Sequence, residues 1–165
     1  MMLSIAFAVT ALNRTLFRLV KWLVVLFALL MLYEVAARYS FASPTSWAPE
    51  LATLLFGPFF LLGGPYLLHT GGHVSVDLLS ARASGLAAKA LKVIAIILAI
   101  VFGVILLWFA FPLAEQSFQY RETSYTSWNP PVWPAKLVLP VSALLLVLQG
   151  FAELLFVLHE EVTSQ

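Results

Sequence analysis

Residues 93–114 read VIAIILAIVFGVILLWFAFPLA and contain no charged side chain. A helix of roughly 20 apolar residues crosses the hydrocarbon core of a bilayer, so this run predicts a transmembrane helix. Three further apolar runs lie at residues 22–39, 51–68 and 137–158. Barrel strands are shorter and alternate in polarity, so continuous runs of this length exclude them. The sequence therefore predicts an all-α integral membrane protein with four transmembrane helices.

The composition also indicates that the bilayer is the solvent of this chain. Hydrophobic residues make up 62% of the 165 residues and charged residues 10%, whereas a soluble domain carries about 25% charged residues. The absence of cysteine excludes disulfides, thiolate catalysis and cysteine-ligated metals. A net charge of +1 without a basic aromatic patch gives no support for a nucleic-acid partner.

Lysine and arginine residues are distributed unevenly about the four runs. Basic residues near membrane helices favour the cytoplasmic side, which predicts cytoplasmic N and C termini. The helices are expected at about 19–40, 50–70, 90–114 and 135–158, in a single membrane domain over 1–165. The cytoplasmic connections hold Arg14, Arg18, Lys21, Arg82, Lys89 and Lys92, and the outer ones hold Arg38, Arg121 and Lys136.

The N-terminal stretch from Ser4 to Lys21 is expected to be a helical lead-in that lies in the interface and runs into the first span. Arg14, Arg18 and Lys21 are spaced i, i+4, i+7, so they share one helix face. This stretch has no basic residue before its apolar start, unlike a secretory signal.

Two of the spans contain ionisable residues. Glu34 and Arg38 lie four residues apart near the outer end of the first span, which favours a mutually neutralising pair over a proton or ion relay. Glu50 could join Arg38 from the start of the second span. Glu153 is the only charge inside the fourth span, where it faces a protein partner or extends to the inner surface.

The stretch from Gly71 to Asp77 reads GGHVSVD and follows the second span. His69, His73 and Asp77 would share a face of a continuous helix, but two adjacent glycines argue against such a helix, since each costs about 1 kcal/mol. The stretch is therefore interpreted as a helix stop followed by a short amphipathic helix between the second and third spans. We expect no metal site, no cofactor and no catalytic residue, since no constellation of nucleophile, base and orienting acid is present.

The second span carries glycine–proline pairs and no charge, which suits packing on other helices. The pairs are Gly57-Pro58 and Gly64-Pro65, and Phe59-Phe60 lies between them. The third span also has no ionisable residue in its core. A carrier needs polar groups or broken helices near mid-membrane, so the lack of ionisable residues in these two spans argues against a transport site within them.

Four stretches in this order and spacing are typical of one family of membrane proteins. They are Arg38-Tyr39-Ser40-Phe41, Trp47 with Glu50-Leu51, the run from Gly71 to Leu79 with His73 and Asp77, and Pro140 with Gln149-Gly150. On these residues the chain resembles the DctQ-like small membrane subunit of tripartite ATP-independent periplasmic (TRAP) transporters. The resemblance covers most of the chain, and one departure is Ser75, where relatives often carry a basic residue.

This resemblance implies a location in the bacterial inner membrane and a supporting role. In the family a large membrane subunit carries substrate and sodium, and a periplasmic binding protein delivers the substrate, commonly an organic acid anion. The small subunit braces the large one and helps to dock the binding protein. The implied large-subunit contacts are Phe56, Phe59, Gly63, Gly64 and Glu153, and the implied docking residues are Trp47, Trp128 and Trp133.

Two other functions compete with this interpretation. One is an independent small homo-oligomeric transporter that is proton-coupled through Glu34. The other is a four-helix haem or quinone protein, for which the histidines are poorly placed because haem needs histidines that face each other from different spans.

Overall fold

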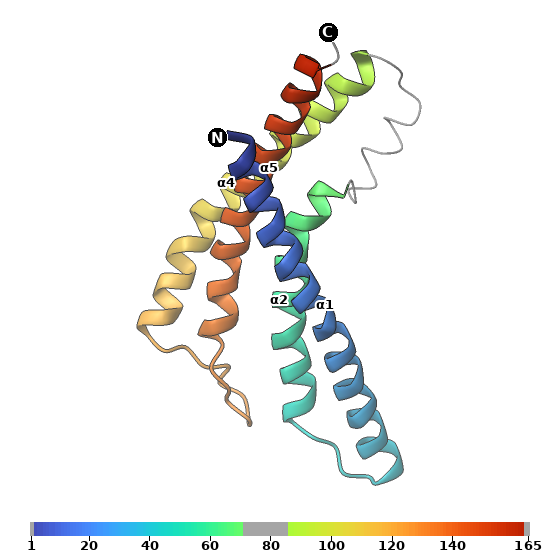
Figure 1. Cartoon of the computed structure of the whole chain (residues 1–165). Helices are drawn as coiled ribbons and strands as arrows, with labels where there is room; N and C mark the ends of the chain where they lie inside the picture. Colours follow the sequence, from blue (N-terminus) through green and yellow to red (C-terminus); the bar gives the residue numbers. More distant parts are fainter. Residues whose placement is uncertain (1, 71–85, 164–165) are drawn as a thin grey trace.

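The computed structural model of the protein describes residues 2–70 and 86–163, and it is built from four long helices (Figure 1). All four are long and apolar enough to cross a membrane. The described residues form no strand, and their one β-bridge joins Thr123 to Pro131. The predicted four-helix all-α fold is therefore confirmed. The helices are α1 (Met2–Ser40), α2 (Trp47–His69), α4 (Leu86–Gln119) and α5 (Trp133–Thr163).

The four helices form two hairpins that cross each other. α1 packs on α2, α4 packs on α5, and α5 also contacts both α1 and α2. The hairpins cross near the N-terminal part of α1 and diverge toward the loops at 41–46 and 120–132 (Figure 1). Among the described helices α4 contacts α5 alone, so most of its apolar surface lies outside the fold.

The first helix is longer than the predicted span because nothing in its sequence interrupts it. α1 runs from Met2 to Ser40 and contains neither glycine nor proline. The lead-in and the first span therefore form one continuous helix, and the interfacial position of the lead-in stays a prediction. α2 ends at His69, and the Thr70 N–H donates to the Tyr66 carbonyl oxygen at 3.2 Å. This end agrees with the expected helix stop, and the short amphipathic helix predicted after it lies outside the described residues.

The α4–α5 hairpin is held by close helix contact at two glycines. A Cβ added to Gly103 would lie 2.8 Å from Val147 Cγ2, and a Cβ added to Gly150 would overlap the side chain of Ile100. Membrane helices commonly use small residues in this way because close approach increases van der Waals contact. The two glycines come from different helices, so each helix admits a side chain of the other.

A proline in α2 creates a hydrogen-bond acceptor that α5 uses. Pro65 has no N–H, so it cannot bond the carbonyl oxygen of Leu61 four residues earlier. The Ser142 hydroxyl of α5 donates to this oxygen at 2.6 Å. A neighbouring helix thus satisfies the backbone group that the proline leaves free, as the hydrocarbon region requires.

Candidate functional site

A cluster of buried polar side chains lies where the two hairpins cross. Asn13 Nδ2 donates to Gln149 Oε1 at 2.8 Å. Gln149 Nε2 donates to Thr10 Oγ1 at 3.1 Å and to Glu153 Oε1 at 2.8 Å. Glu153 Oε1 also lies 2.6 Å from His69 Nδ1. We call these five residues, which come from α1, α2 and α5, the crossing cluster.

Helix periodicity explains how the crossing cluster forms. Thr10 and Asn13 are three residues apart on α1, and Gln149 and Glu153 are four apart on α5, so each pair shares a face. Asn13 and Gln149 are both 0% exposed, and Asn13 Oδ1 has no hydrogen-bond partner among the described residues. Polar groups inside a bilayer stabilise helix contacts by bonding to each other. The crossing cluster therefore fixes how α1, α5 and the end of α2 meet.

Glu153 lies within the chain's own fold. Its side chain is directed toward His69 and Gln149, and the residue is 7% exposed. The sequence left open whether it faces a partner or extends to the membrane surface, and the structure gives it an intramolecular contact. A contact between Glu153 and another subunit stays a prediction.

The carboxylate of Glu34 is fully engaged near the end of α1. Arg38 Nε donates to Oε1 at 3.0 Å, and the Thr45 backbone N–H donates to Oε2 at 3.0 Å. The Thr45 hydroxyl also donates to Oε2. The two bonds from Thr45 hold the loop after α1 against the helix. Glu34 itself is 3% exposed. This geometry agrees with the predicted Glu34–Arg38 pair.

The predicted contact between Glu50 and Arg38 is wrong. In the described part of the chain Arg38 is paired with Glu34, and Glu50 Oε2 accepts a hydrogen bond from Thr126 Oγ1 at 2.7 Å. The reason is that Glu34 lies on the same helix face as Arg38 and reaches it without crossing to another helix. Glu50 instead joins α2 to the loop between α4 and α5.

The loop at 120–132 is held by contacts to the end of α4 and the start of α5. Arg121 has φ 48° and ends α4 in a Schellman motif, since the Glu122 N–H donates to the Ser117 carbonyl oxygen at 3.0 Å. The Arg121 guanidinium lies over the rings of Phe118 and Trp133 at 4.7 and 5.2 Å. Lys136 Nζ lies 2.6 Å from Glu122 Oε2 and lowers the pKa of Glu122 below its usual value.

The three predicted docking tryptophans do not form one cluster. Trp47 contacts Tyr33 on the first hairpin at 5.7 Å between ring centroids, and Trp133 contacts Phe118 on the second at 5.3 Å. Trp128 lies near the tip of the loop, where Tyr125 is 83% exposed. Tyr125, which was not among the predicted docking residues, has φ 57° and is the more exposed ring at this tip.

The four predicted large-subunit contacts on α2 differ in how far this chain's own fold buries them. Phe56 and Phe59 both contact Phe27 of α1, at 5.6 and 6.0 Å between centroids, and Phe56 remains 48% exposed. Gly63 is buried against Phe17. Gly64 has no atom within 4 Å of an added Cβ, so open space lies beside it. Gly64 and Phe56 are thus the positions available to another chain.

The motif from Gly71 to Asp77, with Gly72 and His73, lies outside the described residues. Of His69, His73 and Asp77, for which the sequence argued against a shared metal-binding face, only His69 is described, and this histidine contacts Glu153. The described residues contain no group of three or more histidine, cysteine, aspartate or glutamate side chains that could hold a metal ion.

Comparison with known families identifies the chain. A family model described as "Tripartite ATP-independent periplasmic transporters, DctQ component" matches residues 27–159. The chain belongs to the DctQ family. A comparison with curated proteins found no match. The chain is therefore the small membrane subunit of a TRAP transporter. Its four apolar helices agree with a multi-pass membrane protein.

The DctQ match begins at residue 27, within α1, so Thr10 and Asn13 lie outside it. Their partner Gln149 lies inside it, as does Glu153, to which Gln149 also bonds. From the sequence, Gln149 stands out only as part of a motif, and neither Asn13 nor Thr10 was predicted as a contact. A polar residue every three or four positions along otherwise apolar helices was the available signal.

Proposed function

We propose that this chain braces the large membrane subunit of a sodium-coupled TRAP transporter that depends on a binding protein and takes up organic acid anions. The proposal places it in the bacterial inner membrane with both termini in the cytoplasm. The observation that carries it is that the buried polar groups are bonded within the chain while its outer surface is apolar. The buried polar side chains of the crossing cluster bond chiefly to each other, whereas the outer helix faces are apolar and exposed.

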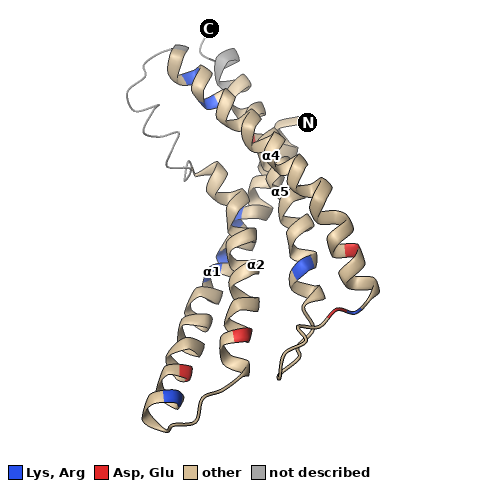
Figure 2. Ribbon diagram, turned by 180° about the vertical axis from the view of Figure 1, so that it is seen from behind, with Lys and Arg blue, Asp and Glu red and all other residues tan. Residues whose placement is uncertain are grey.

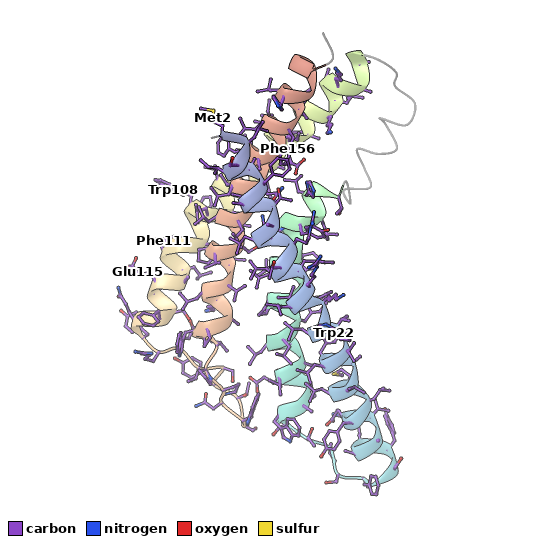
Figure 3. The ribbon with its side chains drawn as sticks, in the orientation of Figure 1. Met2, Trp22, Trp108, Phe111, Glu115 and Phe156 are labelled. Atoms are coloured by element: carbon purple, nitrogen blue, oxygen red, sulfur yellow. The ribbon has the colours of Figure 1, made fainter. Side chains whose placement is uncertain are left out.

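The exposed faces of α4 and α2 supply the surface for bracing. Trp108 and Phe111 point away from the other helices (Figure 3) and are 77% and 58% exposed. Figure 2 shows no charged residue on α4 between the charges near its two ends. On α2, the Phe56 ring is 48% exposed, and open space lies beside Gly64 about two turns further along the helix. Exposed apolar surface of this extent suits a protein partner or lipid.

The loop at 120–132 supports a role in docking the periplasmic binding protein. Its tip exposes Tyr125 and Trp128, and aromatic residues are enriched at protein interfaces. Glu50 and Thr126 hold the loop against the first hairpin. The proposed docking surface therefore centres on the tip, and Trp47 and Trp133 lie at the starts of α2 and α5.

The rival proposal, a proton-coupled transporter that uses Glu34, has weaker support. A coupling carboxylate must exchange its proton, yet both oxygens of Glu34 accept hydrogen bonds from Arg38 and Thr45. Under the bracing proposal, Glu34→Gln reduces assembly modestly and leaves uptake by the assembled complex intact. Loss of uptake by a correctly assembled Glu34→Gln complex would favour the rival.

Co-purification with the large subunit tests the bracing proposal. Gly64→Leu fills space that is empty in this chain, so we expect its own unfolding midpoint to be unchanged while recovery of the large subunit falls at least about tenfold, or about 1.4 kcal/mol. Ala36→Leu, on an exposed face of α1, is the matched control and should co-purify normally.

If the unmodified chain never co-purifies with a co-expressed large subunit, the bracing role is wrong. If the unmodified chain co-purifies and Gly64→Leu does so equally well, bracing stands and the contact face on α2 is wrong.

A further inference from the structure

Three basic side chains on α1 lie on one exposed face. Arg14, Arg18 and Lys21 are all exposed, whereas Asn13, which enters the crossing cluster, is buried. The described part of the chain contains no ion pair to any of the three. We call these residues the basic stripe.

The basic residues near the other end of the bundle are used differently. Arg38 is paired with Glu34, and Lys136 is paired with Glu122. Arg121 lies over two aromatic rings. Arg38 and Lys136 therefore have a carboxylate partner within the chain, and Arg121 has aromatic ones, whereas no described carboxylate pairs with the basic stripe.

The basic stripe lies at the level where α2 ends. Phe17, between Arg14 and Arg18, contacts Tyr66 at 5.0 Å between ring centroids, and Tyr66 is three residues before the end of α2 at His69. A transmembrane helix ends near the lipid headgroups, so the basic stripe is placed at headgroup depth. This placement holds whichever side of the membrane the stripe faces.

The surroundings of the basic stripe fit a phospholipid better than a free anion. Lys21 Nζ lies 5.6 Å from the centroid of the Trp22 ring, and Trp22 is exposed on the outside of α1 (Figure 3). Leu19 is exposed beside Arg18. A phospholipid can place its phosphate on the cations and its acyl chains on Leu19 and Trp22 at once. Tryptophan at the interface and arginine on phosphate are both favoured arrangements.

We propose that the basic stripe binds the headgroup of an anionic phospholipid. The net negative charge matters because a zwitterionic headgroup carries its own cation beside the phosphate. Each basic residue near an anionic membrane surface contributes about fivefold to binding, which corresponds to about 1 kcal/mol. The inference depends on membrane insertion alone and not on the bracing proposal.

Lipid retention by the full-length chain tests this site. The chain is purified in micelles that contain phosphatidylglycerol and phosphatidylcholine, and the bound lipids are counted by native mass spectrometry. We expect preferential binding of phosphatidylglycerol, an about fivefold loss in Arg18→Gln, and recovery in Arg18→Lys. Arg121→Gln is the matched control, since it removes one exposed cation from the outer loop and should leave lipid retention unchanged. High salt should weaken binding because it screens exposed charges.

Three results would overturn the proposal. The first is equal phosphatidylglycerol retention in Arg18→Gln and in the unmodified chain, with all variants monodisperse. The second is an equal loss in Arg121→Gln, which would indicate nonspecific charge attraction. The third is displacement of the lipid by inorganic phosphate at comparable concentration, which would indicate a site for a soluble anion.

Discussion

Gln149→Leu removes the residue that joins the crossing cluster while it nearly preserves side-chain volume. Gln149 is fully buried and takes part in hydrogen bonds with Asn13, Thr10 and Glu153. The bonds to Asn13 and Thr10 join α5 to α1, and hydrogen bonds between membrane helices contribute about 0.6 kcal/mol each, so these two contribute about 1 kcal/mol. The substitution also leaves the Asn13 amide unpaired, and an unpaired buried polar group costs about 1–3 kcal/mol. We expect a total loss of about 3 kcal/mol in the free energy of unfolding.

The double variant Asn13→Leu with Gln149→Leu separates the two contributions. It leaves no amide without a partner, Thr10 keeps its bond to the Ala6 carbonyl oxygen at 3.0 Å, and Glu153 keeps His69. We expect it to be about 2 kcal/mol more stable than the sum of the single variants, because residues in one network couple strongly. Reversible unfolding in mixed micelles, titrated with a denaturing detergent, measures all three variants.

The matched control is Leu148→Met, the neighbouring position on α5, whose side chain is exposed. It should unfold like the unmodified chain. The reasoning is refuted if Gln149→Leu changes the free energy of unfolding by less than about 0.5 kcal/mol, or if the two single effects simply add.

Three further predictions concern helix contacts and the loop at 120–132. Ser142→Ala should cost about 1 kcal/mol in the unfolding titration, and almost nothing in a Pro65→Ala background, where a restored N–H bonds the carbonyl that Ser142 served. Gly150→Ala should cost about 1–3 kcal/mol because its methyl group overlaps α4, whereas Gly57→Ala, with open space around it, should be tolerated. The pKa of Glu122 is lowered in the folded state, so its stabilisation of the loop is complete above the usual glutamate pKa and is lost as pH falls through the lower folded value. Fluorescence of the loop tryptophans across an acid titration measures this loss.

The sequence predicted the helices well because their signal is local. An apolar run of membrane length requires a helix whatever it packs against, since the backbone must bond to itself in lipid. The same holds for the Glu34–Arg38 pair, whose partners lie one helical turn apart. The ends of the helices were less predictable: α4 extends from Leu86 to Gln119, past both ends of the expected 90–114.

Contacts between helices could not be predicted because they depend on how the hairpins cross. Asn13 and Gln149 are 136 residues apart in sequence, and no local pattern indicates that they meet. The wrong prediction for Glu50 has the same origin. Its neighbour is Thr126, on a loop distant in sequence, and not Arg38. His69 was considered for a metal face on its own helix, yet its contact is Glu153 on α5.

The distribution of polar contacts separates what this chain does for itself from what it leaves to partners. At the crossing, Gln149 and Glu153 use their hydrogen-bonding groups on α1 and α2, so these groups serve the fold. At the opposite end of the bundle, near the loops at 41–46 and 120–132, Glu34 and Lys136 are likewise engaged within the chain. The exposed part of α4 between its terminal charges offers only apolar surface, and the basic stripe on α1 offers cations without internal anions. A membrane subunit arranged in this way is suited to pack against a larger protein and its lipids, because among the described residues its own fold leaves the apolar surface of α4 uncovered and the cations of the basic stripe without an anion.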